Sequence, residues 1–319
     1  MFPKLSIIQD GTIMIVREKQ NWLRLLFVWR GSILKDILPR LVFLFLFSVL
    51  VVYFRGKLLD YDFSFNPVPL TFIGIALAIF LGFRNNASYE RFWEARKLWG
   101  SLLNTTRSLT RQAITMSGLS ANSPQVSLFV HLLIAFTYTL KHQLRQTEAN
   151  SDLTRLLPTS LATSIQKGQY KPIRILKELG IWIQQRKQEG HIDSVTETAF
   201  DYNLNKLSEI VGGCERIANT PIPFPYTLLL HRTVYAYCYL LPFGLVDSSG
   251  WMTPLFVVLT GYAFMGLDAV VSEIEEPFGL EPNDLALNGM SKMIESTLLE
   301  MIDLEAPFLP PPHNSFFID

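Results

Sequence analysis

The sequence predicts an all-α integral membrane protein with four transmembrane helices and a large helical cytoplasmic region. Hydrophobic residues make up 49% of the 319 residues and charged residues only 18%, whereas soluble domains carry about 25% charged residues. Mean hydropathy is +0.23. The chain contains four long apolar runs. We find no alternation of apolar and polar residues long enough to predict a β-strand.

The four runs differ in length. A membrane-spanning helix needs about 20 mostly apolar residues, so the first and fourth runs qualify only if flanking residues join the helix. The alternative is buried helices of a large soluble protein. The density of Phe, Leu and Val and the flanking charges favour a membrane. The runs are Leu41 to Phe54, about Phe63 to Phe83, Tyr226 to Leu245 and Trp251 to Leu267.

Basic residues are distributed unevenly around these runs. The loop between the first two runs holds Arg55 and Lys57, and the loop "VDSSG" between the last two holds none. Because Lys and Arg concentrate in cytoplasmic segments, the distribution predicts a multi-pass protein with both termini and the long middle segment in the cytoplasm. The basic residues on that side are Lys4, Arg17, Lys19, Arg24, Arg30, Lys35, Arg40, Arg84, Arg91, Arg96, Lys97, Arg107 and Arg111.

The long middle segment is expected to be helical. Gly190 is expected to end one of its helices. Ser194 is expected to cap the next, with Glu197 completing a capping box. The predicted segments are the N-terminus with two spans (1–83), a cytoplasmic region (84–225), two further spans (226–270) and a cytoplasmic C-terminal segment (271–319).

One helix is expected to continue from the second apolar run into polar sequence, since a single glycine does not stop a helix. Ile75, Ile79 and Phe83 recur every four residues along it and form a bulky apolar stripe. The periodicity leaves open whether this stripe faces lipid or a pore. In a ring of identical subunits it would form stacked apolar rings, which can gate ion flow by dewetting.

A second stripe on the same helix is built from small residues. Gly74, Ala78 and Gly82 also recur every four residues, next to the bulky stripe. Small residues at this spacing let membrane helices approach closely. We therefore expect this stripe to be a helix-packing face between subunits of the ring.

The sequence gives little indication of catalysis. It contains no G-x-S-x-G, G-x-x-x-x-G-K or G-x-G-x-x-G, so we expect neither an enzyme nor a cofactor. Lys+Arg and Asp+Glu are equal at 28 each, which gives no hint of nucleic-acid binding. Cys214 and Cys238 form no C-x-x-C motif. His231 and Arg232 lie within the third run, where a functional role and pairing with a carboxylate are both open.

Several long strings resemble the bestrophin family of pentameric ion channels, especially its bacterial members. They are "AIFLGFRNNASYERFWEARKLWG", "WRGS", "GGCERIANTPIPFPYTLLLHRTVY" and "EEPFG". The resemblance implies a homopentamer in the bacterial inner (plasma) membrane, with a neck at Ile75, Ile79 and Phe83. It also implies a cytoplasmic aperture at Val195, at the start of the helix before "GGCER".

The resemblance further implies a channel for monovalent ions, with membrane lipid as the surroundings. Chloride or other anions are expected as in the wider family. Monovalent cations such as sodium, as in some bacterial relatives, are the alternative. A membrane transporter or non-conducting scaffold is a third reading, although the two span pairs show no repeat of the transporter kind.

Acidic residues follow the fourth run and could ligate a hard cation or form a solvated face. Animal bestrophins bind calcium with an acidic run directly after "PFG". This chain has "LEPND" there, with only Glu281 and Asp284 as weak candidates, so little calcium dependence is expected. The other acidic residues of this stretch are Glu273, Glu275 and Glu276.

Overall fold

The structure, a computed structural model, describes residues 14–15, 23, 32–54, 57–58, 61–62, 66–281, 283–305 and 317–318. It divides into two compact units, which are described separately. We call Arg17–Phe92 with Pro221–Glu276 the apolar unit, and Met1–Val16 with Trp93–Thr220 and Pro277–Asp319 the polar unit. These two units do not test which segments lie in the membrane and which in the cytoplasm, so the predicted segments 1–83, 84–225, 226–270 and 271–319 stay a prediction.

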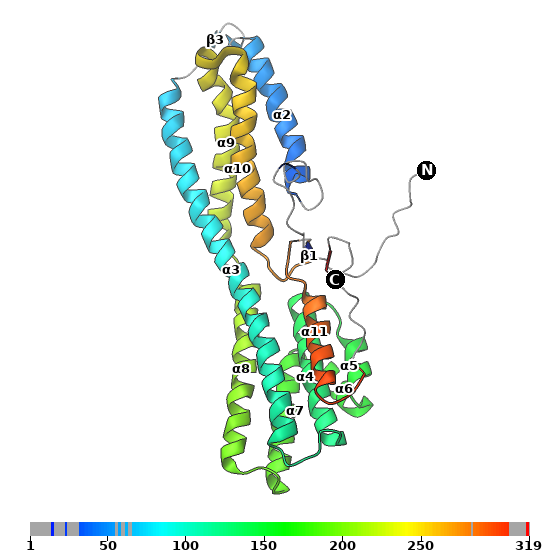
Figure 1. Cartoon of the computed structure of the whole chain (residues 1–319). Helices are drawn as coiled ribbons and strands as arrows, with labels where there is room; N and C mark the ends of the chain where they lie inside the picture. The colour runs from blue at the N-terminus through cyan, green and yellow to red at the C-terminus, as the bar shows by residue number, and fades with distance from the viewer. Residues whose placement is uncertain are drawn as a thin grey trace, which may run out of the picture. The chain divides into compact units, whose positions relative to one another are not determined.

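The described part of the chain is almost entirely helical (Figure 1), which confirms the all-α class. Two-residue strands are its other elements: β1 pairs antiparallel with β4, and β2 with β3. The strands are β1 (Met14–Ile15), β2 (Lys57–Leu58), β3 (Tyr61–Asp62) and β4 (Phe317–Ile318). The helices are α2 (Leu34–Tyr53), α3 (Pro67–Thr115), α4 (Pro124–Leu144), α5 (Asn150–Leu156), α6 (Thr159–Gln166), α7 (Lys171–Gln188), α8 (Ser194–Asn219), α9 (Phe224–Ser249), η1 (Gly250–Met252), α10 (Thr253–Ile274) and α11 (Leu287–Glu300).

Most of each predicted apolar run lies in a helix: the first in α2, the second from Pro67 onward in α3, the third in α9, and the fourth in η1 and α10. Flanking residues extend the two short runs, so that α2 has 20 residues and α10 has 22. Helix α3 continues past Gly82 without a break, as expected, for 49 residues. Among the described residues, three helical segments are long and apolar enough to cross a membrane: α2, α3 and the segment Phe224–Ile274, which holds both α9 and α10.

The surfaces of these helices favour a membrane over the interior of a soluble protein. Large apolar side chains are exposed on them, including Phe72 at 68%, Leu255 at 57% and Leu259 at 64%. Exposing so many apolar side chains to water is energetically unfavourable, whereas contact with lipid tails carries no such penalty. We conclude that the chain is a membrane protein.

Within the apolar unit, α10 packs against α2 and α9 (Figure 1). Gly261 of α10 faces Leu44 of α2, where a Cβ would lie 2.6 Å from the leucine Cδ2. Gly244 of α9 faces Leu70 of α3 in the same way, at 2.4 Å. The helices can therefore approach closely at these two positions because no side chain stands between them.

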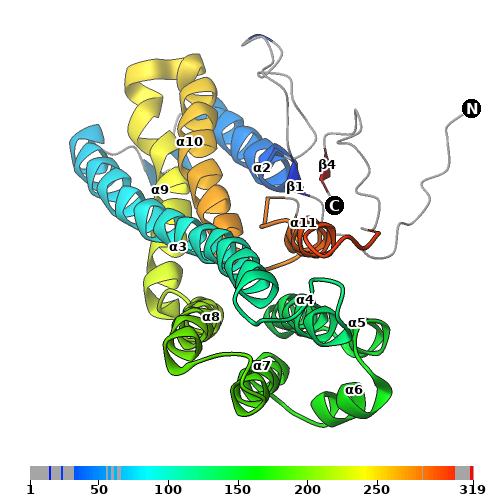
Figure 2. The same cartoon turned by 60° about the horizontal axis from the view of Figure 1, so that its bottom comes forward.

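Helices α4 to α8 follow one another through the polar unit (Figure 2). An aromatic cluster joins three of them: the Phe129 ring of α4 lies 4.4 Å from Trp182 of α7 and 6.0 Å from Phe200 of α8. Helix α7 ends as predicted. Gly190 takes the left-handed conformation at φ 77°, and the His191 N–H donates to the Arg186 carbonyl.

The predicted cap of α8 is wrong by one residue. Asp193, not Ser194, is the N-cap, and its carboxylate accepts from the Thr196 N–H at 2.8 Å. Ser194 is instead the first helical residue, and the Glu197 carboxylate pairs with Lys187 rather than forming a capping box. The Thr196 N–H bond lowers the pKa of Asp193. Asp and Ser are comparably good caps, so adjacent candidates could not be separated by residue type.

Both cysteines are free and fully buried. Burial raises the pKa of Cys214 in α8 to about 12, so almost no thiolate forms at neutral pH. We expect the folded protein to resist a disulfide reagent at pH 8 and to react only after unfolding. Absorbance of the released thiolate checks this, and rapid labelling of folded protein would contradict the burial.

Some residues used in the sequence analysis lie outside the described part of the chain. They are Lys4, Arg17, Lys19, Arg24, Trp29, Arg30, Gly31, Arg55 and Phe63.

Candidate pore neck and polar clusters

The bulky stripe of α3 lies on an exposed face of the apolar unit. Ile75 is 54% exposed, Ile79 53% and Phe83 61%. The opposite face of the same helix is buried against the unit, at Leu77 and Leu81 among others. The three stripe residues therefore share one face, and that face is free of packing within the subunit.

The small-residue stripe has a mixed environment. A Cβ on Gly74 would lie 2.6 Å from the Tyr237 hydroxyl of α9, so Gly74 makes its close approach within its own chain. Ala78 is exposed, and a Cβ on Gly82 would meet no atom within 4 Å. Ala78 and Gly82 are thus the members of this stripe that lie open to a neighbouring molecule.

Val195 is the second residue of α8 and is 77% exposed. The Asp193 cap fixes the start of the helix, so the valine projects from a defined position although its side chain is not packed. Within a single chain this valine is therefore not part of a buried core. Its role as an aperture stays a prediction.

A buried ionic cluster directly follows the bulky stripe of α3. Arg84 is 1% exposed, and its guanidinium donates to Asp268 at 2.5 Å, to the Ser272 hydroxyl at 3.1 Å and to Glu275 at 3.3 Å. The second oxygen of Asp268 lies 2.8 Å from His231 Nδ1. His231 is therefore paired with a carboxylate, one of the two readings that the sequence left open.

The acidic stretch after α10 is used in local structure. Glu275 pairs with Arg84 rather than lying on a solvated face. Asp284 is 2% exposed and accepts from the Glu281 N–H at 2.7 Å, which closes the turn between them. Among the described residues, no group of three or more His, Cys, Asp or Glu side chains is arranged to hold a metal ion.

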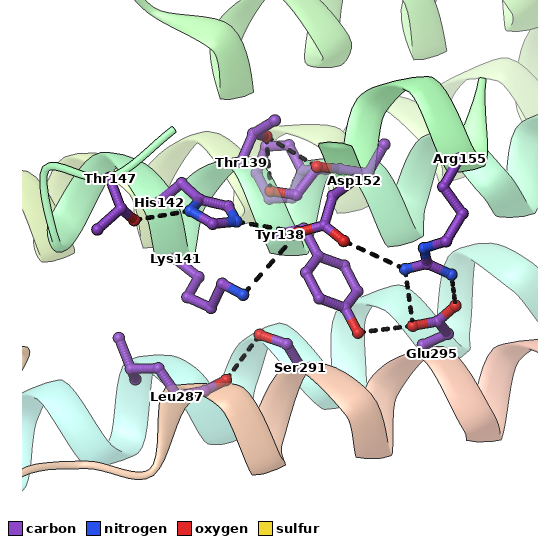
Figure 3. Close-up of polar contacts among 12 residues, drawn as sticks. Tyr138, Thr139, Lys141, His142, Thr147, Asp152, Arg155, Leu287, Ser291 and Glu295 are labelled. Carbon is purple, nitrogen blue, oxygen red and sulfur yellow. Dashed lines mark hydrogen bonds and ion pairs between the residues drawn. The ribbon is translucent and has the colours of Figure 1, made fainter. Parts of the chain in front are cut away.

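A second polar cluster joins three helices of the polar unit (Figure 3). Glu295 of α11, 3% exposed, accepts from the Tyr138 hydroxyl of α4 at 2.6 Å. Arg155 of α5 donates to both oxygens of the same carboxylate. Alongside, Asp152 of α5 lies 2.9 Å from His142 Nε2 and 4.0 Å from the Lys141 ammonium. The cluster attaches α11 to α4 and α5.

Burial and charge shift the pKa values in this cluster. Burial raises the pKa of Tyr138 well above its ordinary value, and Glu295 adds to the effect. Burial lowers the pKa of Lys141, although Asp152 opposes it. Burial by itself would raise the pKa of Asp152. The hydrogen bond with His142 and the nearby charges of Lys141 and Arg155 outweigh burial and hold this pKa below its usual range.

The sign of the Asp152 effect follows from linkage. The pKa is lower in the folded protein than in the unfolded chain, so the carboxylate contributes stability above about pH 4, the ordinary aspartate value. That contribution is lost as pH falls through the lowered pKa. The arrangement therefore stabilises the polar unit at neutral pH.

Sequence reasoning missed several of these residues. Arg84 was counted only as a cytoplasmic positive charge, and neither Asp268 nor Glu295 was assigned a partner. One signal was available for α10: Asp268, Ser272 and Glu275 are spaced i, i+4 and i+7, which is one face of a helix. No comparable spacing marks Glu295.

Comparisons with known proteins find a matching family and related proteins over most of the chain. A family described as "Bacterial/Fungal Bestrophin protein" matches residues 14–300. A voltage-dependent anion channel-forming protein of Ralstonia nicotianae is 48% identical over 91% of this chain and 94% of its own. One of the same description from Escherichia coli K12 is 43% identical over 94% and 99%. The crystal structure of a single-substitution variant of a bacterial bestrophin homologue from Klebsiella pneumoniae aligns with a TM-score of 0.81, at 42% identity, over 84% of this chain and 99% of that one.

Proposed function

The chain belongs to the bestrophin family, and we propose from this that it is a homopentameric ion channel with a central pore lined by α3. In this proposal α2, the first part of α3, α9 and α10 span the bacterial inner membrane. Both termini and the polar unit then lie in the cytoplasm. No enzymatic role or cofactor is part of the proposal.

The observation that carries the proposal is the exposed stripe Ile75, Ile79 and Phe83. Bulky apolar residues repeat there on one face of a spanning helix, and the subunit leaves that face uncovered. A lipid-facing helix would also expose apolar residues. Family membership favours the pore instead, because relatives that cover almost the same length of chain are named as channel-forming proteins.

The side of α3 next to this stripe supports assembly into a ring. An apolar groove of about 470 Å³ between α3, α9 and α10 is lined by Gly74, Ile75 and Ala78 among others. In the proposed ring the neighbouring subunit fills this groove and covers Ala78 and Gly82. Mass measurement in mild detergent tests the ring: a pentamer is expected, and a monomer that still conducts would rule it out.

The permeating ion is proposed to be chloride or another small anion, because the curated relatives are named as anion channel-forming. The apolar neck does not set the sign of the charge. Reversal potentials of the purified protein in lipid bilayers with asymmetric salt test the proposal. A reversal potential near that of chloride is expected. One near that of the cation would mean a sodium-type channel, and absence of conductance would favour a transporter or scaffold.

Val195 is proposed to form the narrowest ring at the cytoplasmic end of the pore. Replacing it with Ala removes two methyl groups from each subunit, so we expect a changed single-channel conductance or ion preference with the pentamer intact. Because the side chain is 77% exposed in the subunit, little stability should be lost. Unchanged current per channel together with a weaker oligomer would place the aperture elsewhere.

Calcium is not expected to control opening. Asp284 is buried in a turn with Glu281, and Glu275, earlier in the same stretch, pairs with Arg84. A calcium site needs six to eight oxygen ligands, which this arrangement does not provide. Current should be the same in a chelator as in micromolar calcium. A current that disappears in chelator and returns with calcium would overturn this prediction.

A further inference from the structure

The side chain next to the last neck residue is tied to another helix. Phe83 is followed by Arg84, which is fully buried and bonded to Asp268 and Ser272 of α10 and to Glu275, the residue that follows α10. Removing one partner of a buried charge pair is costly, because the remaining charge is left without compensation. The turn of α3 that carries Phe83 is therefore fixed to α10 through Arg84.

Asp268 connects this attachment to a third helix. One of its oxygens accepts from Arg84 of α3, and the other lies 2.8 Å from His231 Nδ1 of α9. The His231 side chain is 47% exposed, whereas Asp268 is 7% exposed. The histidine can thus exchange protons with water while its partner stays buried. Histidine is the residue whose charge ordinarily changes between about pH 5 and 8.

We propose that Arg84, Asp268 and His231 form a positioning triad for the Phe83 ring, and that protonation of His231 tightens it. The inference rests on the proposed channel function. Neutral His231 shares one hydrogen bond with Asp268. Protonation of His231 places a positive charge beside the Asp268 carboxylate, so that the hydrogen bond becomes an ion pair with both partners charged. Acid therefore joins α9 to α10 more firmly, holds Phe83 in the neck and opposes its wetting.

The groups facing His231 come from each helix packed around it. On α9 its ring lies 4.5 Å from the ring of Tyr235, whose hydroxyl accepts from Arg40 of α2 at 2.8 Å. On α3, Arg91 donates to the Glu275 carbonyl at 3.3 Å beyond the triad. Arginine keeps its charge at all relevant pH values, so the carboxyl of Glu275 is the group to control besides the Asp268 carboxyl of the triad itself.

The test compares single-channel current of the full-length protein in bilayers at two pH values, about 8 and about 5.5, which bracket the usual range of histidine. The wild-type current should fall roughly threefold on acidification, a change in the range that one strengthened hydrogen bond can produce. His231→Gln keeps a donor but does not titrate, so its current should not respond to pH. His231→Arg is charged at both values and should give the low current at both.

Two further variants separate the triad from its surroundings. Glu275→Gln removes the Glu275 carboxyl and should keep the pH response. Asp268→Asn should raise the current at both pH values; if it fails to assemble, Ser272→Ala provides the milder loss of one Arg84 contact and should raise current slightly.

The outcomes distinguish this inference from the channel function itself. A wild-type current that is insensitive to pH, or a His231→Gln current that responds as the wild type does, overturns the triad while leaving the channel intact. Loss of the pH response in Glu275→Gln would also overturn the triad, because Glu275 and not His231 would then be the group that responds to pH. Absence of current from every variant and from the wild type would overturn the channel function and the inference with it.

Discussion

Replacing Ile79 with Ala in every subunit should raise the single-channel current about threefold or more, because hydrophobic constrictions gate by dewetting. Five copies of a smaller side chain widen the middle ring of the proposed neck and ease the entry of water. Ile79→Ser should act similarly, since its hydroxyl offers water a hydrogen bond. Recordings in bilayers at fixed voltage and symmetric salt give the measurement.

Ala78 provides the matched control one position away. Ala78 is exposed within the subunit and lies on the side of α3 that the ring is proposed to cover. Ala78→Leu should hinder close helix approach and reduce the pentamer fraction, whereas Ile79→Ala should leave the pentamer intact. A lipid-facing Ile79 predicts near-normal current in both of its variants. Near-normal current in assembled channels of both variants would mean that this stripe does not form the gate.

Replacing Glu295 with Ala should release α11 from the polar unit. The carboxylate is 3% exposed and accepts from Tyr138 and from both amino groups of Arg155. Because Arg155 is 48% exposed, solvent discounts its share. A loss of about 2 kcal/mol follows, which is about 30-fold in the local opening equilibrium. Hydrogen exchange of α11 amides should accelerate by that factor.

Glu300 is the control for this experiment, since it is an exposed carboxylate at the end of the same helix. Glu300→Ala should leave exchange in α11 unchanged. Arg155→Met alone and combined with Glu295→Ala completes a double-mutant cycle, in which the two losses should not add. Additive losses would mean that the two side chains do not stabilise α11 as a pair.

The apolar helices and the exposed bulky stripe could be predicted because they are periodic properties of local sequence. Ile75, Ile79 and Phe83 are visible as a stripe at four-residue spacing, and the run of apolar residues fixes where α3 lies. Likewise Gly190 marks the end of α7 because only glycine adopts its positive φ at low cost. Each of these features can be recognised from a short stretch of sequence, without knowledge of contacts to distant parts of the chain.

The ionic clusters could not be predicted because their partners are far apart in the chain. Arg84 and Asp268 are 184 residues apart, and Tyr138 and Glu295 are 157 apart. Charge counting treats Arg84 as a solvated cation near the membrane surface, and only tertiary packing shows it to be buried. Sequence identified the helix that carries the candidate site but not the contacts that position it.

The burial of both cysteines makes the natural sequence suitable for accessibility scanning with thiol reagents. Cys214 and Cys238 are each 0% exposed, so a cysteine introduced elsewhere would be the reactive one. Charged methanethiosulfonate reagents attack thiolates in water and not in lipid. Cysteine at Ile75 or Ile79 should therefore be modified if the stripe faces an aqueous path, and cysteine at Leu259 of α10 gives the lipid-exposed comparison. Such a scan would identify, residue by residue, which positions are in contact with water, and no native cysteine would need to be replaced first.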